Sequence, residues 1–332
     1  NIILWIDKNP NVKLIQLAPH DGEAEQCTCE KCAPFSKAEN YTTFLSKIAT
    51  KVNSAHPDVR IILLVYFDIW ECPNQLKLDP SLIAMESTWA TGGHKGLRTA
   101  GKPDGSCLNG SMYEENLLKW KQAGADVMYY DYYMGVYVMR QRYFPIADEI
   151  QAIWKRFCEK GILGASTQIE CFNLWNHIFN FYTFGRTGYD VSLSMEDNLT
   201  HFTRIFGAGA QWMKKAILHA ENCLDGQISM PFCPEFLFKN IDNKLMHNCF
   251  NHALKEAETP SARNSVRLFR MAFRYTELEQ LEENANSAEQ PFVRNYPNIN
   301  PELLYMTRFD SYWKNNPGYG ITIALDKKKR IM

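Results

Sequence analysis

The sequence predicts an α/β protein: a TIM-like (β/α)8 barrel, of which this chain carries the later strands, followed by a helical C-terminal region. Three observations predict it. Short apolar segments alternate with amphipathic helices over residues 13–170. No hairpin signal joins one segment to the next, which favours parallel strands joined by crossovers. Acidic and aromatic residues follow strand after strand, whereas an open sheet gathers its functional residues at one switch point.

The expected strands are short apolar runs. The clearest is 60–66, whose unbroken apolar character is typical of a parallel strand covered on both faces. The full set spans residues 13–18, 60–66, 81–86, 126–131 and 164–170. A doubly wound sheet would have the same order of elements. Since a closed barrel of this type has eight strands, we expect about three more upstream of residue 1, or missing.

Helices are expected between the strands and again after residue 188. Those between strands cover 41–54, 113–123 and 146–159, and Gly124 and Gly161 are expected to stop the last two. Residues 1–6 resemble the end of an amphipathic helix. Further helices are expected at 195–206, 211–220, 239–257 and 261–284. We therefore assign residues 1–190 to the barrel portion with the active site, and 191–332 to a helical barrel-closing and C-terminal region.

Composition narrows the function classes. The net charge is −1, so no basic excess is present to bind nucleic acid. No apolar run approaches the roughly 18 residues of a membrane span, and the chain starts without a signal peptide. Aromatic residues make up 13% of the chain, and some of them fall at predicted strand ends, where sugar rings could stack on them.

Carboxylates at the strand ends are the candidate catalytic residues. Asp21 follows the first strand, Asp131 ends the fourth and Glu170 ends the fifth. In barrel enzymes these ends meet at one rim. Glycoside hydrolysis needs one carboxyl group to protonate the leaving oxygen and another group to stabilise the positive charge on the sugar. Any single carboxylate could instead cap a helix or pair with a cation.

Aromatic residues near the same ends are the candidate substrate-binding residues. Tyr66, Trp89, Tyr133 and Trp175 could line sugar subsites, although about two of them could instead complete the barrel core. His20, beside Asp21, could orient a partner or bind substrate; a structural histidine fits the position equally well.

Three cysteines form a separate constellation. Cys27, Cys29 and Cys32 have the C-x-C-x-x-C spacing that can place three sulfur atoms around one structural zinc ion, with His20 or Cys72 as a fourth ligand. A disulfide or free thiols fit the spacing equally well. Catalysis is expected to require no cofactor, and the sequence lacks a phosphate-binding glycine loop.

The order of these motifs resembles the domain-of-unknown-function family 4838 (DUF4838) of bacterial glycan-degrading proteins, which overlaps glycoside hydrolase family 163. The resemblance covers about residues 1–210. Its matching motifs are Leu17-Ala-Pro-His-Asp-Gly22, the three cysteines, His56-Pro57, Leu64-Val-Tyr66, Tyr129-Tyr-Asp-Tyr-Tyr133, and Gly161-Ile-Leu-Gly164 leading to Glu170.

The resemblance implies a barrel preceded by a smaller N-terminal domain, and an extracytoplasmic, secreted protein of the periplasm or cell surface. It also implies activity like that of endo-β-N-acetylglucosaminidases, in which the 2-acetamido group of the substrate assists. Asp21 and Asp131 would then orient or stabilise that group, and Glu170 would be an acid or a sugar ligand.

The expected function is therefore hydrolysis of N-acetylhexosamine-containing glycans, with a glycan or glycoprotein as partner. The alternative is a non-catalytic glycan-binding protein on a degenerate glycosidase barrel. A third hypothesis is a metalloenzyme centred on the cysteines.

Overall fold

The computed structural model describes residues 2–18, 27–65, 69–73, 77–87, 110–134, 143, 145–169, 174–223 and 241–284. The chain divides into two compact units. The first contains residues 1–132 and 153–168, and the second contains 133–152 and 169–332. The predicted division at residue 190 stays a prediction.

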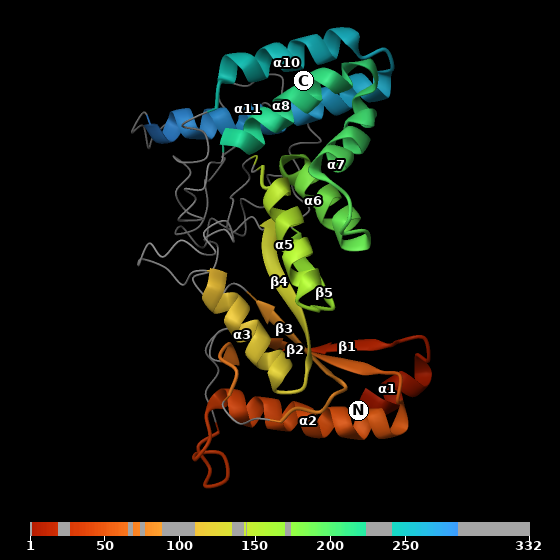
Figure 1. Cartoon of the computed structure of the whole chain (residues 1–332), viewed down its shortest axis with the longest axis vertical. Helices are drawn as coiled ribbons and strands as arrows, with labels where there is room; N and C mark the ends of the chain where they lie inside the picture. The colour runs from red at the N-terminus through yellow and green to blue at the C-terminus, as the bar shows by residue number, and fades with distance from the viewer. Residues whose placement is uncertain are drawn as a thin grey trace, which may run out of the picture. The chain divides into compact units, whose positions relative to one another are not determined.

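A curled parallel sheet of five strands forms the centre of the first unit (Figure 1). The strands are β1 (Leu14–Leu17), β2 (Arg60–Val65), β3 (Leu82–Ser87), β4 (Asp126–Met134) and β5 (Gly164–Ile169), and they lie side by side in chain order. All five match predicted strands. The sheet is a half-barrel, which confirms the α/β class and the parallel arrangement. A complete barrel stays a prediction.

The two faces of the sheet have different surroundings. Val65, Glu86 and Tyr129 lie at one register level across β2, β3 and β4. The Tyr129 ring packs edge-on against Phe157 of α5 (Ala147–Glu159), with 4.8 Å between ring centroids. On the other face, Ile62, Ile83 and Met85 form an apolar cluster together with the partly buried side chains of Leu64, Met128 and Tyr130.

Helices cover the sheet as the sequence predicts. α1 (Ile2–Lys8) contacts α2 (Lys37–Ala55), α2 packs on β2, and α3 (Gly110–Gln122) packs on β3 (Figure 1). Gly124 and Gly161 follow α3 and α5 with φ of 106° and 67°, a conformation that side chains disfavour. Both predicted helix stops are therefore confirmed.

The second unit is helical in its described part beyond β5. Its helices are α6 (Leu174–Tyr189), α7 (Met195–Phe202), the 3-10 helix η5 (Thr203–Gly209), α8 (Ala210–Cys223), α10 (Asn243–Glu256) and α11 (Pro260–Asn284). The sequence predicted helices at α7, α8, α10 and α11, but α6 was missed. The predicted helix 195–206 ends at Phe202 and continues as a 3-10 helix, with Gly207 at a φ of 58°.

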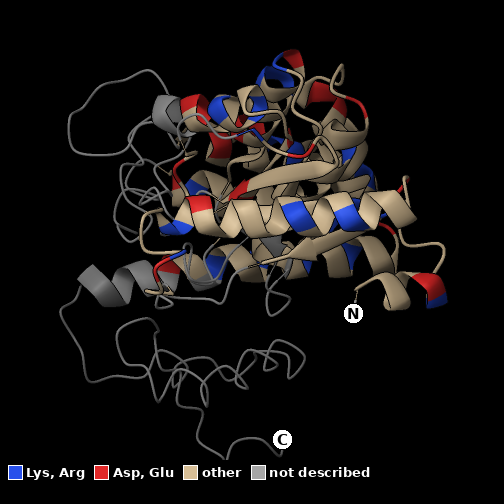
Figure 2. Cartoon of the chain, turned by 90° about the horizontal axis from the view of Figure 1, so that it is seen from below, with Lys and Arg blue, Asp and Glu red and all other residues tan. Residues whose placement is uncertain are grey.

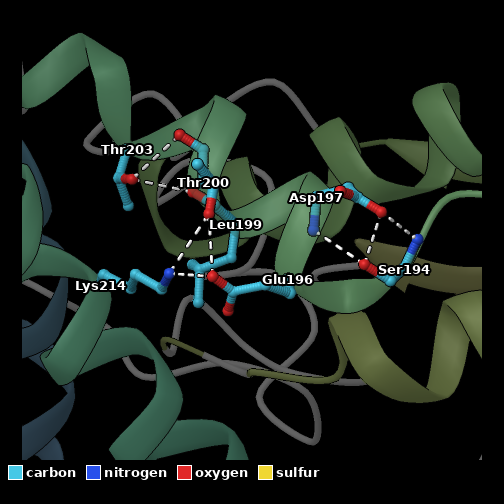
Figure 3. Close-up of polar contacts among 7 residues, drawn as sticks. All are labelled: Ser194, Glu196, Asp197, Leu199, Thr200, Thr203 and Lys214. Atoms are coloured by element: carbon cyan, nitrogen blue, oxygen red, sulfur yellow. Dashed lines mark hydrogen bonds and ion pairs between the residues drawn. The ribbon is translucent and has the colours of Figure 1, made fainter.

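Side chains define where α7 begins and what it contacts (Figure 3). Ser194 accepts a hydrogen bond from the Asp197 amide, and the Asp197 carboxylate accepts one from the Ser194 amide, so the two form a capping box. Glu196, the residue before Asp197, pairs with Lys214 of α8. This pair ties α7 to the neighbouring helix.

Charged residues of both signs are interspersed along the described helices (Figure 2), in keeping with the net charge of −1. Within the described ranges, none of the helices combines the length and apolarity needed to cross a membrane.

Candidate functional site

Some of the predicted site residues lie within the described part of the chain. Asp131, Trp175 and the three cysteines are described, and Tyr133 lies in β4 but its side chain lies outside the description. The predicted residues outside the described ranges are His20, Asp21, Tyr66, Trp89 and Glu170. Their roles stay predictions.

Asp131 lies inside β4. The prediction that it ends the strand is wrong, because β4 continues to Met134 through two further tyrosines, and aromatic residues favour extended backbone. The side chain is buried, at 8% exposure. Alternation along a strand directs Asp131 to the same face as Tyr129, whose ring packs against α5. A catalytic role for Asp131 therefore requires that the substrate reach the face of the sheet on which Tyr129 packs against α5.

Trp175 lies in the first turn of α6 and is partly buried. His177, two residues on, is 4% exposed, and among the described residues its Nδ1 has no hydrogen-bond partner. Burial lowers the pKa of His177 to about 4, so the ring is neutral at physiological pH. Nothing in the sequence assigned a role to His177.

Glu86, at the second-to-last position of β3, is the centre of a buried polar network that the sequence analysis missed. Its Oε1 accepts hydrogen bonds from Trp70 Nε1 at 2.5 Å and from Asn116 Nδ2 at 2.8 Å. Asn116 also donates to the Trp70 carbonyl and accepts from the Cys72 amide. Trp120 Nε1 donates to the same Trp70 carbonyl at 3.2 Å.

This network holds the segment 69–73, which follows the carboxyl end of β2, against β3 and α3. Glu86 is fully buried, and the loss of solvation raises its pKa well above the ordinary range, although the hydrogen bonds from Asn116 and Trp70 oppose this. A neutral carboxyl group is the expected form. Since Glu86 has no solvent access, it acts by positioning the segment. The signal in the sequence that could have identified Glu86 is an acidic residue at the end of an apolar strand.

The three cysteines lie together on the segment between β1 and α2. Their sulfur atoms all lie within 4.8 Å of one another, and none of the three forms a disulfide. Cys27 and Cys29 are exposed, and Cys32 is partly buried. This arrangement could hold a metal ion. Cys72 is buried in the Glu86 network and is not part of this group, so the suggestion of Cys72 as a fourth ligand finds no support.

Cys29 and Cys32 differ in acidity. Hydrogen bonds from the Cys27 thiol and from the backbone N–H groups of Cys32 and Lys31 lower the pKa of Cys29 to about 7. Hydrogen bonding to Cys29 and Cys27 raises the pKa of Cys32 to about 11. One thiolate is therefore favoured near neutral pH, which suits ligation of a cation.

The fold and these sites define an α/β protein with a parallel half-barrel, a buried acid network near its strand ends, and a three-cysteine cluster. The family model described as "Domain of unknown function (DUF4838)" matches residues 1–218, and the chain belongs to that family. No curated protein and no solved structure shows significant similarity to the chain.

Proposed function

We propose that the protein is a glycoside hydrolase that cleaves N-acetylhexosamine-containing glycans in the manner of endo-β-N-acetylglucosaminidases. The observation that supports this most is the parallel register of β2, β3 and β4, which brings their carboxyl ends to one edge of the sheet. That is the edge where barrel enzymes assemble their active sites. Asp131 carries a carboxyl group near that edge, on the strand next to the one that carries the buried, positioning residue Glu86.

The roles follow from the chemistry of the reaction. Asp21, four residues after β1, and Asp131 would orient the 2-acetamido group and stabilise the charge that develops on the sugar. Glu170, directly after β5, would be the acid or a sugar ligand. The aromatic side chains of Tyr66, Trp89, Tyr133 and Trp175 would hold the sugar rings, with His20 beside Asp21.

The proposal extends to a complete (β/α)8 barrel and to the resemblance with glycoside hydrolase family 163, from which the endo-acting mode and the extracytoplasmic location derive. Catalysis requires no cofactor in this proposal. A zinc ion at the three-cysteine cluster would have a structural role only.

The test is release of N-glycans from a glycoprotein by the wild type, Asp131→Asn and Glu170→Gln. Loss of a group that acts by acid-base catalysis lowers the rate by about 10²–10⁴-fold. Asp126→Asn is the matched control, because Asp126 begins the same strand, β4, and forms a surface ion pair with Arg60 at the opposite end. It should keep wild-type turnover.

Two results would contradict the proposal. Equal turnover in Asp131→Asn, Glu170→Gln and Asp126→Asn would remove both residues from catalysis. Glycan binding without turnover in every form, including the wild type, would instead support the non-catalytic glycan-binding alternative. The burial of Asp131 makes that alternative worth testing.

A further inference from the structure

We propose that Cys27, Cys29 and Cys32 bind one zinc ion that fastens the segment preceding α2 to that helix. This inference does not rest on the proposed glycosidase activity. Zinc bound by thiolates has Zn–S distances of about 2.3 Å, so sulfur atoms in a tetrahedral site lie about 3.8 Å apart. The three sulfur atoms lie within 4.8 Å of one another, so small side-chain adjustments would give this spacing.

The backbone around the cysteines is already ordered in the shape that ligation needs. The amides of Cys32 and Ala33 both donate to the Cys29 carbonyl at 2.9 Å, which closes a turn between the second and third cysteines. The Phe35 amide donates to the Cys32 carbonyl at 3.1 Å. The chain's own backbone hydrogen bonds therefore hold the turn that carries Cys29 and Cys32.

Side chains of α2 hold the same turn from the other side. Asn40 Nδ2 donates to the Cys32 carbonyl at 2.9 Å, and Ser36 and Glu39 form a capping box at the start of the helix. Tyr41, one residue further, donates from its hydroxyl to the carbonyl of Leu17, the last residue of β1. An ion at the cysteines would therefore be coupled, through α2, to the end of β1.

The sulfur donors narrow the choice of metal ion. Thiolates are soft ligands that favour zinc or monovalent copper over magnesium and calcium, which bind oxygen. The site is built on a short turn packed at a helix start, a place suited to a structural ion. Three sulfur ligands leave one position of the zinc tetrahedron for a further ligand.

The test measures metal content and cobalt spectra of the full chain, purified under reducing conditions. Inductively coupled plasma mass spectrometry should find about one zinc ion per chain. Cobalt added to the metal-free protein should give the intense near-ultraviolet band of thiolate ligation. Cys29→Ser and Cys32→Ser should weaken metal affinity by at least about tenfold, because loss of even an outer-shell partner of a metal site typically costs that much. Cys158→Ser is the matched control, since Cys158 is an exposed free thiol on α5.

Hydrogen exchange gives a second readout. Chelation of zinc from the wild type should speed exchange of the amides of residues 29–36 and leave the sheet strands β2 and β3 unchanged. The proposal is overturned if the reduced wild type binds neither zinc nor cobalt, or if Cys29→Ser and Cys32→Ser bind as tightly as Cys158→Ser. Should a serine variant fail to fold, the cobalt spectrum and exchange of the wild type decide alone.

Discussion

The two units of the protein bury their side chains in different ways. In the first unit, a hydrogen-bonded network of Trp70, Glu86, Asn116 and Trp120 lies against the carboxyl end of β3. In the second unit, rings dominate the interior around Phe269, which packs against Tyr143, Phe206 and Phe250. A hydrogen-bonded network thus lies beside the sheet edge where a site is proposed, while a cluster of packed rings lies in the interior of the helical unit.

This difference changes the meaning of the aromatic content. Part of it falls at strand ends, where sugar-stacking residues are predicted. The helical unit accounts for a further set by packing alone: Tyr143, Phe179, Phe202, Phe206, Phe250, Phe269 and Phe273 are all buried there. Aromatic abundance by itself is therefore no evidence for a glycan site, and the case depends on the strand-end residues.

The largest expected effect tests the aromatic interior. Phe269→Ala should lower the free energy of unfolding by about 3–5 kcal/mol, because the fully buried ring leaves a cavity among three other rings. Urea denaturation of the full chain measures it. Phe181→Ala, at a ring that is 40% exposed, is the control and should cost much less. Equal costs would mean that the ring cluster is not the centre of this unit.

The second prediction concerns the buried histidine of the helical unit. The pKa of His177 is lowered to about 4 in the folded chain, from about 6.5 in an unfolded one. The unfolded state therefore binds the extra proton first, and stability present above pH 6.5 is lost as pH falls toward 4. The loss approaches about 3 kcal/mol.

Urea unfolding at pH 7.5 and pH 4.5 measures this loss. His177→Gln should remove most of the difference, whereas His252→Gln, on the exposed side of α10, should leave it unchanged. If His177→Gln keeps the full pH dependence, another group is responsible.

The third prediction tests the polar network of the first unit. Glu86→Ala should cost about 2–3 kcal/mol, because the partly buried Trp70 donor and the buried Asn116 donor lose their acceptor. Glu86→Gln keeps an acceptor oxygen and should cost less. Since burial raises the pKa of Glu86, the wild type has the full stability of the neutral acid below about pH 4.5 and loses it as pH rises.

Denaturation series at pH 4 and pH 8 check both points. Glu86→Gln should gain on the wild type as pH rises. A constant difference between the two would mean that Glu86 is ionised in the folded protein.

The smallest effect tests close packing between helices. In Gly209→Ala, the new methyl group would lie 2.7 Å from the Ala253 carbonyl oxygen, so the backbones of η5 and α10 must separate, at a cost of about 1–3 kcal/mol. Gly185→Ala is the matched comparison, because no atom lies within 4 Å of its added methyl group and α6 should gain about 0.5–1 kcal/mol. Thermal melts of both variants should shift in opposite directions.

Local sequence signals predicted the elements well where they were strong. Apolar runs located the five strands, and Gly124 and Gly161 located two helix ends, because both signals act over a few residues. The signals failed at boundaries. Tyr132 and Tyr133 extend β4 past Asp131. In the aromatic-rich segment 174–189, strand-like residues mask the helical periodicity, so the sequence did not predict α6.

The candidate site was predictable only in part. A strand end that carries an acid is visible in the sequence, and Asp131 was selected on that basis. Glu86 carries the same signal, but its network could not be predicted, because its partner Asn116 comes from a helix 30 residues further along the chain.

What the sequence by itself determined is the order of strands and helices, the parallel class of the sheet and the spacing of the three cysteines, because these follow from short-range patterns of apolar residues, glycines and thiols. Only the tertiary structure decided that Glu86 is buried with a raised pKa and that Cys27, Cys29 and Cys32 bring their sulfur atoms together. The physical reason is that solvation and ligand geometry depend on groups that folding alone brings near.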